Sequence, residues 1–221
     1  MNAPEALPSS SAADRVYLET KELILSGDVP AGRLLSEGDI AQRMSVSRTP
    51  VREAFVRLQS EDLLELIPKR GAVVTPVPTS EAMDVLETRA ALEVAAVRRM
   101  TSRMDDLTAL LAALGDLVTQ QREAAEAGDV AAFARLDVGF HATVVSSSGN
   151  QLATRFYATL ADRQRRMNIG AMTPDPGRMA ICADEHEALA GEIRERDLAG
   201  FEIYLRTHLS ATHLVAGQWL A

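Results

Sequence analysis

The sequence predicts a mainly α protein, in which one short β-hairpin near residue 70 interrupts a succession of helices. Aromatic residues make up only 4% of the chain, whereas hydrophobic residues make up 47%, and Ala and Leu are abundant among them. Two short apolar runs flank a basic turn with a glycine at 68–71, a pattern typical of a hairpin. Pro76-Val77-Pro78 then forms a stiff linker. We therefore expect two domains, at 13–78 and 79–221.

The beginning of the chain divides into a tail and a helix. Residues 1–12 are rich in Pro, Ser and Ala and are expected to form a disordered tail. From about Asp14 to Ser26, side chains at helical spacing predict a helix that packs under the next two. These side chains are Val16, Thr20, Leu23 and Ile24.

Two short helices are predicted next, separated by a tight turn. Ser36 is a good N-cap for the first, at about 36–44, and Asp39 would complete a capping box. Ser47 would cap the second, and Pro50 falls at its third position, where a missing N–H breaks no helical bond. The turn at 45–46 makes the pair a helix-turn-helix.

The second of these helices has separate apolar and basic faces. Val51, Phe55 and Leu58 form one apolar stripe, while Arg48 and Arg52, four residues apart, share another face. Guanidinium groups near a helix N-terminus suit phosphate contact and bidentate recognition of guanine. An ordinary solvated amphipathic helix is the alternative interpretation of this stretch alone.

The hairpin that follows favours the DNA-binding interpretation. Its strands are predicted around 63–67 and 72–75, and its basic tip would lie beside the recognition helix, as in a winged helix-turn-helix. The predicted DNA-binding residues are Ser47, Arg48, Thr49, Pro50, Arg52, Lys69, Arg70 and Gly71.

The overall charge limits the kind of nucleic-acid binding that is expected. The chain carries a net charge of −8, yet 43–57 contains four arginines and a single acid, Glu53. Binding depends on the local surface rather than on the chain average, so a small and defined contact face is predicted. The single cysteine, Cys182, fits a reducing cytoplasm, and no membrane span or signal peptide is recognisable.

Residues 79–221 are predicted to form an all-helical antiparallel bundle, with Thr79 or Ser80 capping its first helix. Polar, glycine-containing or proline-containing breaks separate the helices. Six helices are expected, near 80–100, 103–126, 129–147, 151–170, 177–197 and 199–217.

One carboxylate and three histidines could form a metal site inside this bundle. Asp137 and His141 share a helix face, and His186 and His208 lie on two later helices. Together they would form an incomplete shell around a divalent ion. His213, five residues after His208, is expected to point away from it. Any one of these histidines, taken alone, is more often an ordinary core or surface residue.

The N-terminal motifs resemble a known family. Ser-Arg-Thr-Pro-Val-Arg-Glu-Ala at 47–54 and Pro-Lys-Arg-Gly-Ala-Val-Val at 68–74 are similar to the DNA-binding domain of GntR-type bacterial transcription regulators. The resemblance covers about 12–77. Gly38 departs from the pattern, because the family often has a DNA-contacting arginine there. Asp62 replaces a glycine that often ends the recognition helix.

Residues 79–217 more loosely resemble the FCD domain found in the FadR-like branch of that family. The resemblance implies that Asp137, His141, His186 and His208 bind a metal, most often zinc, with nickel or manganese as alternatives. It also implies that a small organic acid binds beside the metal. Arg89 matches an arginine that often faces this ligand, although it could instead be a surface residue paired with Glu93.

These features predict a cytoplasmic, ligand-responsive transcription regulator, expected to be a repressor. A homodimer on a palindromic operator is expected, because one recognition helix covers only a few base pairs. Two alternatives remain open from the residues. One is a metal-dependent hydrolase that uses the Asp/His₃ site to activate water. The other is an architectural DNA-binding protein whose helical part only dimerises.

Overall fold

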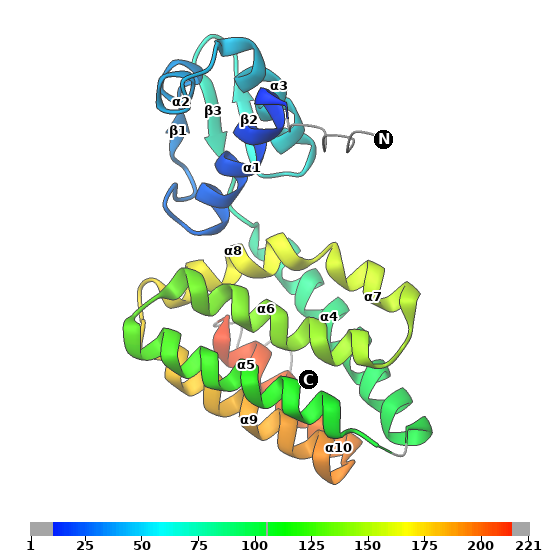
Figure 1. Ribbon diagram of the computed structural model, residues 1–221. Coiled ribbons are helices and arrows are strands. Elements are labelled where there is room, and N and C mark those ends of the chain that lie inside the picture. Colours follow the sequence, from blue (N-terminus) through cyan, green and yellow to red (C-terminus); the bar gives the residue numbers. More distant parts are fainter. Residues whose placement is uncertain (1–10, 105, 214–221) are drawn as a thin grey trace, which may run out of the picture. The chain divides into compact units, whose positions relative to one another are not determined.

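The computed structural model describes residues 11–104 and 106–213 (Figure 1). The chain divides into two compact units, Met1–Pro76 and Val77–Ala221. Within the described residues, no helix is both long and apolar enough to cross a membrane.

The first unit begins with a well-capped helix, α1 (Ala12–Leu25). The Ser11 side chain accepts a hydrogen bond from the Asp14 backbone N–H, and the Asp14 carboxylate accepts one from the Ser11 backbone N–H. Ser11 and Ala12 therefore belong to the helix and its cap rather than to the predicted tail, whose remaining residues, 1–10, lie outside the described ones.

A helix-turn-helix and a three-stranded antiparallel sheet complete this unit. The sheet order is β1-β3-β2, and β2 and β3 form the expected hairpin. The first strand was not predicted, because two residues are too few to show an alternating pattern. The elements are β1 (Leu34–Leu35), α2 (Glu37–Arg43), α3 (Arg48–Ser60), β2 (Leu64–Ile67) and β3 (Gly71–Val74).

The apolar stripe of α3 is the centre of the first core. Val51, Phe55 and Leu58 are each at most 1% exposed and pack with Val16 and Ile24 of α1. This packing fixes which face of α3 remains in solvent. Burying a side chain of this size stabilises a fold by about 1.5–3 kcal/mol, so the stripe alone largely determines how α3 is oriented.

Two features at the ends of α3 follow from local geometry. Ser47 is the N-cap residue as predicted, but its side chain makes no capping hydrogen bond, so that part of the prediction was wrong. Asp62, just beyond the helix, has φ +59°, the left-handed conformation for which the glycine of related sequences is suited.

The second unit is a helical bundle with one more helix than predicted (Figure 1). Its first helix is preceded by Pro78 rather than capped by Thr79 or Ser80. The described helices are α4 (Thr79–Arg103), α5 (Thr108–Ala127), α6 (Val130–Ser147), α7 (Gln151–Ala158), α8 (Ala161–Met172), α9 (Arg178–Glu195) and α10 (Leu198–Thr212). The predicted end of the last helix, 214–217, lies outside the described residues.

The extra helix arises because the predicted helix at 151–170 is divided at Thr159-Leu160. The backbone N–H groups of both residues bond to carbonyls three positions earlier, and the Thr159 hydroxyl also donates to the Phe156 carbonyl. Such tightened bonds end a helix without Gly or Pro, so the sequence carries no recognisable stop signal there.

The bundle encloses an apolar core and, beside it, a group of buried polar side chains. Helix α5 packs against α6 and α9, α10 packs against α9 and α4, and α6 also contacts α4 and α8 (Figure 1). Leu86, Leu114 and Val144 are among the residues of the core with no exposed surface. The buried polar group lies where these helices face one another and includes Glu93, His141, His186 and His208.

Candidate functional site

The predicted DNA-binding residues of α3 are in solvent. Ser47, Arg48 and Thr49 at its beginning are exposed, as is Arg52 one turn later, whereas Pro50 is half-buried. Because the apolar stripe faces α1, the opposite, basic face is free to contact a partner.

Residues of α2 orient both arginines. The Nε atom of Arg52 donates to the Glu37 carboxylate at 2.7 Å. A Cβ atom at Gly38 would lie 3.5 Å from the Arg48 Nη2 atom, so the Arg48 guanidinium lies directly against this glycine. A cation is thus present beside position 38 even though the arginine common there in related sequences is missing.

A third arginine of this helix is oriented differently. Arg57 forms an ion pair with Asp14 of α1 at 2.6 Å and lies 3.9 Å from the centre of the Tyr17 ring. It stabilises the contact between α1 and α3. The arginines left on the basic face of α3 are Arg48 and Arg52, both exposed, and Arg43 at the end of α2 is exposed as well.

The tip of the wing presents two basic side chains. Lys69 and Arg70 are exposed, and Lys69 has φ +64°, a turn conformation that few L-residues adopt. Gly71 was predicted to contact DNA, but the structure gives it a packing requirement. It has φ +118°, and an added Cβ atom would overlap the Leu35 carbonyl oxygen of β1.

In the bundle, the four predicted metal ligands converge. The Nε2 atoms of His141 and His186 are 3.1 Å apart, and His186 Nε2 is 3.5 Å from the Asp137 Oδ1 atom. The His208 ring centre lies 4.7 Å from that of His186 and 5.3 Å from that of His141. None of the four is more than 2% exposed. Helices α6, α9 and α10 each contribute to this cluster.

Each of the three imidazoles has an oxygen partner on its other ring nitrogen. His141 Nδ1 lies 2.7 Å from Glu93 of α4, His186 Nδ1 lies 2.8 Å from the Gln121 amide oxygen of α5, and His208 Nδ1 lies 2.8 Å from Glu185. The tautomer in which Nδ1 donates to this oxygen leaves Nε2 unprotonated and able to bind a metal.

Burial also favours the neutral imidazole that coordination requires. Desolvation lowers the pKa values of His141, His186 and His208 well below the usual value of 6.5, and the positive charge of Arg89 lowers them further. Asp137 accepts a hydrogen bond from the Asn168 side chain of α8 at 2.6 Å, which orients its carboxylate. Three neutral imidazoles and one oriented carboxylate are a donor set that fits a divalent metal ion.

The structure places a fifth candidate donor in the cluster, Cys182. Its Sγ atom is 3.6 Å from Asp137 Oδ1 and 3.8 Å from His186 Nε2. From the sequence alone, Cys182 is interpreted only as evidence for a reducing compartment. The missed signal was its position four residues before His186, which places both side chains on one face of α9.

Arg89 is a buried member of the polar group. It is 1% exposed, and its Nε atom lies 3.3 Å from Glu93 Oε1. The ion pair with Glu93, considered above as an alternative to ligand binding, is therefore present, but it is buried and not at the surface. Burial opposes the charge, but Tyr157 and Glu93 raise the pKa of Arg89, which therefore stays protonated. Tyr157 in turn donates to Glu93 at 2.6 Å.

Several buried side chains around the cluster keep a polar atom without a hydrogen-bond partner among the described residues. They lie on α4, α5 and α8, and unsatisfied buried groups of this kind are costly unless a ligand or water contacts them. They are Arg89 (Nη2), Gln121 (Nε2), Gln164 (both amide atoms) and Asn168 (Oδ1).

His213 is the remaining histidine of the bundle. It follows α10, is half-buried, and its pKa is lowered to about 3 by burial and by the charges of Arg89, His208 and Arg178. It is the C-cap residue of α10.

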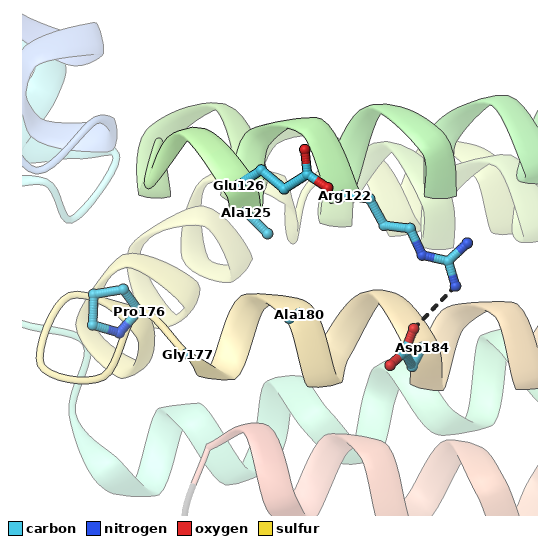
Figure 2. A pocket seen from close by; sticks show the side chains of 7 residues that line it. All are labelled: Arg122, Ala125, Glu126, Pro176, Gly177, Ala180 and Asp184. Atoms are coloured by element: carbon cyan, nitrogen blue, oxygen red, sulfur yellow. Dashed lines mark hydrogen bonds and ion pairs between the residues drawn. The ribbon is translucent and has the colours of Figure 1, made fainter.

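A separate surface pocket of about 450 Å³ lies between α5 and α9 (Figure 2). The Arg122 side chain bounds it and forms an ion pair with Asp184 at 3.0 Å. The other lining residues are Ala125, Glu126, Pro176, Gly177 and Ala180. It contains none of the predicted site residues.

Comparison with known proteins agrees with both parts of this description. Residues 12–74 match the gntR family of bacterial regulatory proteins, and residues 84–211 match the FCD domain. The chain belongs to the GntR family. It carries an FCD domain as its second unit.

Individual relatives of this GntR protein support the assignment. An HTH-type transcriptional regulator in an unstable DNA locus of Streptomyces ambofaciens is 30% identical over 203 residues, 89% of this chain and 81% of that protein. The HTH-type transcriptional repressor RspR of Escherichia coli K12 is 27% identical over 205 residues, 91% of this chain and 87% of that one.

Solved structures show the same fold. A GntR transcriptional regulator from Rhodococcus sp. RHA1 superposes with a TM-score of 0.78 at 21% identity, covering 95% of this chain and 100% of that one. E. coli McbR/YncC gives a TM-score of 0.73 at 20% identity, covering 94% and 97%.

This GntR protein is therefore a DNA-binding transcription regulator and not the metal-dependent hydrolase considered as an alternative, since its families and relatives are regulators. The match to the FCD domain spans Arg89, the four predicted metal ligands and Cys182.

Proposed function

We propose that this regulator represses transcription from a palindromic operator as a cytoplasmic homodimer, and that a small organic acid bound near a divalent metal in the bundle modulates operator binding. The DNA contacts come from Ser47, Arg48, Thr49, Pro50 and Arg52 of the α3 region, and from Lys69, Arg70 and Gly71 of the wing. Gly71 allows the wing to approach β1.

One observation carries the metal part of the proposal. Each imidazole of the cluster has an oxygen partner for Nδ1, supplied by α4, α5 or α9, and the Nε2 atoms of His141 and His186 face each other at 3.1 Å. A histidine that served only packing would not need this common orientation. Asp137, His141, His186 and His208 would hold the ion, with zinc the first candidate and nickel or manganese next. Bound there, the ion would supply positive charge that attracts a carboxylate.

Arg89 supports the organic acid as the second ligand. It is a buried guanidinium with a nitrogen, Nη2, that lacks a partner among the described residues. A guanidinium fork matches carboxylate geometry, and the free amide atoms of Gln164 and Asn168 could bind further oxygens. A small carboxylate is the ligand class that satisfies these groups together.

The decisive experiment compares His186→Ala with the exposed α9 variant Glu195→Ala. Metal content, operator affinity and the change in operator affinity with added small carboxylic acids are measured on each and on the wild type. We expect His186→Ala to lose metal and the response to acids while operator binding without acid stays near wild type, because effector control depends only on differential affinity for the two states. Wild-type metal content and response in His186→Ala would refute the proposal.

A further inference from the structure

We propose that Cys182 is a metal ligand of this centre and that its thiolate makes the site select zinc and cobalt over manganese and magnesium. The inference rests on the proposed metal function and adds a donor to it.

The positions of the donor atoms support this assignment. Cys182 Sγ, Asp137 Oδ1 and His186 Nε2 lie 3.5–3.8 Å from one another, and these atoms with a His208 nitrogen all fall within 4.8 Å. Bonds of about 2.0–2.3 Å in a tetrahedral zinc site place neighbouring ligand atoms roughly 3.3–3.7 Å apart. The donor atoms of Cys182, Asp137 and His186 therefore already have nearly the spacing of neighbouring ligands in a zinc site.

Charge balance gives an independent reason for a thiolate. Among the carboxylates near the cluster, Glu93 pairs with Arg89 and Glu185 pairs with Arg178. Asp137 then provides a single negative charge, which would leave a divalent ion with one uncompensated positive charge in a buried site. Uncompensated buried charge is costly. The Cys182 thiol is in contact with Asp137, and loss of its proton on metal binding would supply a second negative charge beside the ion.

The surroundings of Cys182 are also consistent with a ligand at the edge of an apolar layer. On one side it packs in a cluster with Phe133, Met172 and Met179, and on the other its sulfur faces Asp137 and His186. A metal bound by such a sulfur is shielded from solvent. Soft sulfur donors favour zinc and cobalt, while manganese and magnesium prefer oxygen. The alternative is a simple S–H hydrogen bond to Asp137, which predicts no effect on metal choice.

Cobalt titration of the metal-free full-length protein distinguishes these alternatives. We expect wild-type protein to develop near-ultraviolet thiolate-to-cobalt charge-transfer absorption, and Cys182→Ser and Cys182→Ala to lack it. Zinc affinity of both variants should fall by about tenfold or more, since losing even an indirect partner of a metal ligand has an effect of that size. Manganese affinity should change little.

The outcomes separate this inference from the proposed function. Cobalt binding by wild-type protein without the charge-transfer band, together with unchanged zinc affinity in Cys182→Ser, overturns the role of Cys182 and leaves the Asp/His₃ site intact. Failure of wild-type protein to bind cobalt or zinc overturns both proposals. The band is measured on the wild type, so the result does not depend on either variant folding.

Discussion

At the scale of single residues, the proposed operator recognition depends on Arg48 and Arg52. Arg48 lies against Gly38, where a longer side chain would compete with it, and Arg52 is held by Glu37. That ion pair is largely exposed, and pairs of this kind contribute about 0–1 kcal/mol. Glu37 can therefore orient Arg52 without keeping it from DNA.

Replacing either arginine with alanine should weaken operator binding by about 1–3 kcal/mol if that side chain contacts a base. The midpoint of thermal unfolding should stay near wild type, because both side chains are exposed and neither belongs to the apolar stripe. Fluorescence anisotropy with labelled operator measures the first effect. Wild-type affinity in the doubly substituted protein would show that α3 is not the recognition helix.

The wing lysine is expected to act differently. Lys69→Ala should weaken binding to operator and to unrelated DNA by similar factors, because a lysine at a turn tip contacts phosphates rather than bases. The slope of log affinity against log salt should become shallower by about 1. A loss confined to operator sequences would assign Lys69 to base contact instead.

Residue types and spacings were enough to predict that Asp137, His141, His186 and His208 come together, because Asp137 and His141 lie four apart on one helix and the bundle brings in the other two. They could not identify Cys182 or the oxygen partners of the imidazoles. Glu93 and Gln121 contact their histidines across the bundle. They are separated from them in sequence by 48 and 65 residues. Such partners are fixed by tertiary packing and leave no local pattern.

At the scale of elements, the cluster joins α6, α9 and α10, so its protonation is linked to the stability of the bundle. The histidine pKa values are lowered in the folded state, and an unfolded chain returns them to about 6.5. The contribution of the neutral histidines to the free energy of unfolding is therefore fully present above about pH 6.5. It is lost as the pH falls below that value, because the unfolded state then binds more protons.

We therefore expect the metal-free protein to melt at a lower temperature at pH 5.5 than at pH 7.5. Each histidine that is protonated only on unfolding contributes a slope of about 1.4 kcal/mol per pH unit. Burial raises the pKa values of Glu93 and Glu185, which partly offsets this effect. Comparison with His186→Gln isolates the imidazole, and this variant should show a shallower dependence on pH. Equal slopes would mean that His186 does not titrate on unfolding.

The elements themselves were predictable to different degrees. Helices with clear flanking signals, such as α6 between Asp129 and Gly149, begin and end close to the predicted residues. The division between α7 and α8 was not predictable, because Thr159 ends the helix through its own hydroxyl and tightened backbone bonds. Strand β1 exists only through its pairing with β3, which is a tertiary contact.

At the scale of the whole molecule, two compact units join at Pro76-Val77, and each has its own apolar core. This organisation is consistent with the proposal that the first unit binds DNA and that the second dimerises and binds the effector. The architectural alternative keeps the same division but assigns no ligand to the bundle, so only the metal and effector measurements distinguish it.

A fragment of residues 1–78 tests whether the bundle supplies the dimer. Its core is contained within the first unit, so it should fold and show cooperative thermal unfolding. Its affinity for a palindromic operator should nevertheless fall by about two orders of magnitude or more. In a dimer, the second DNA-binding unit is held near its half-site at an effective concentration of about millimolar, and separate fragments lose this advantage. Sedimentation should show a monomeric fragment and a dimeric full-length protein. Equal operator affinity for the two would place the dimer contact, or all of the specificity, within residues 1–78.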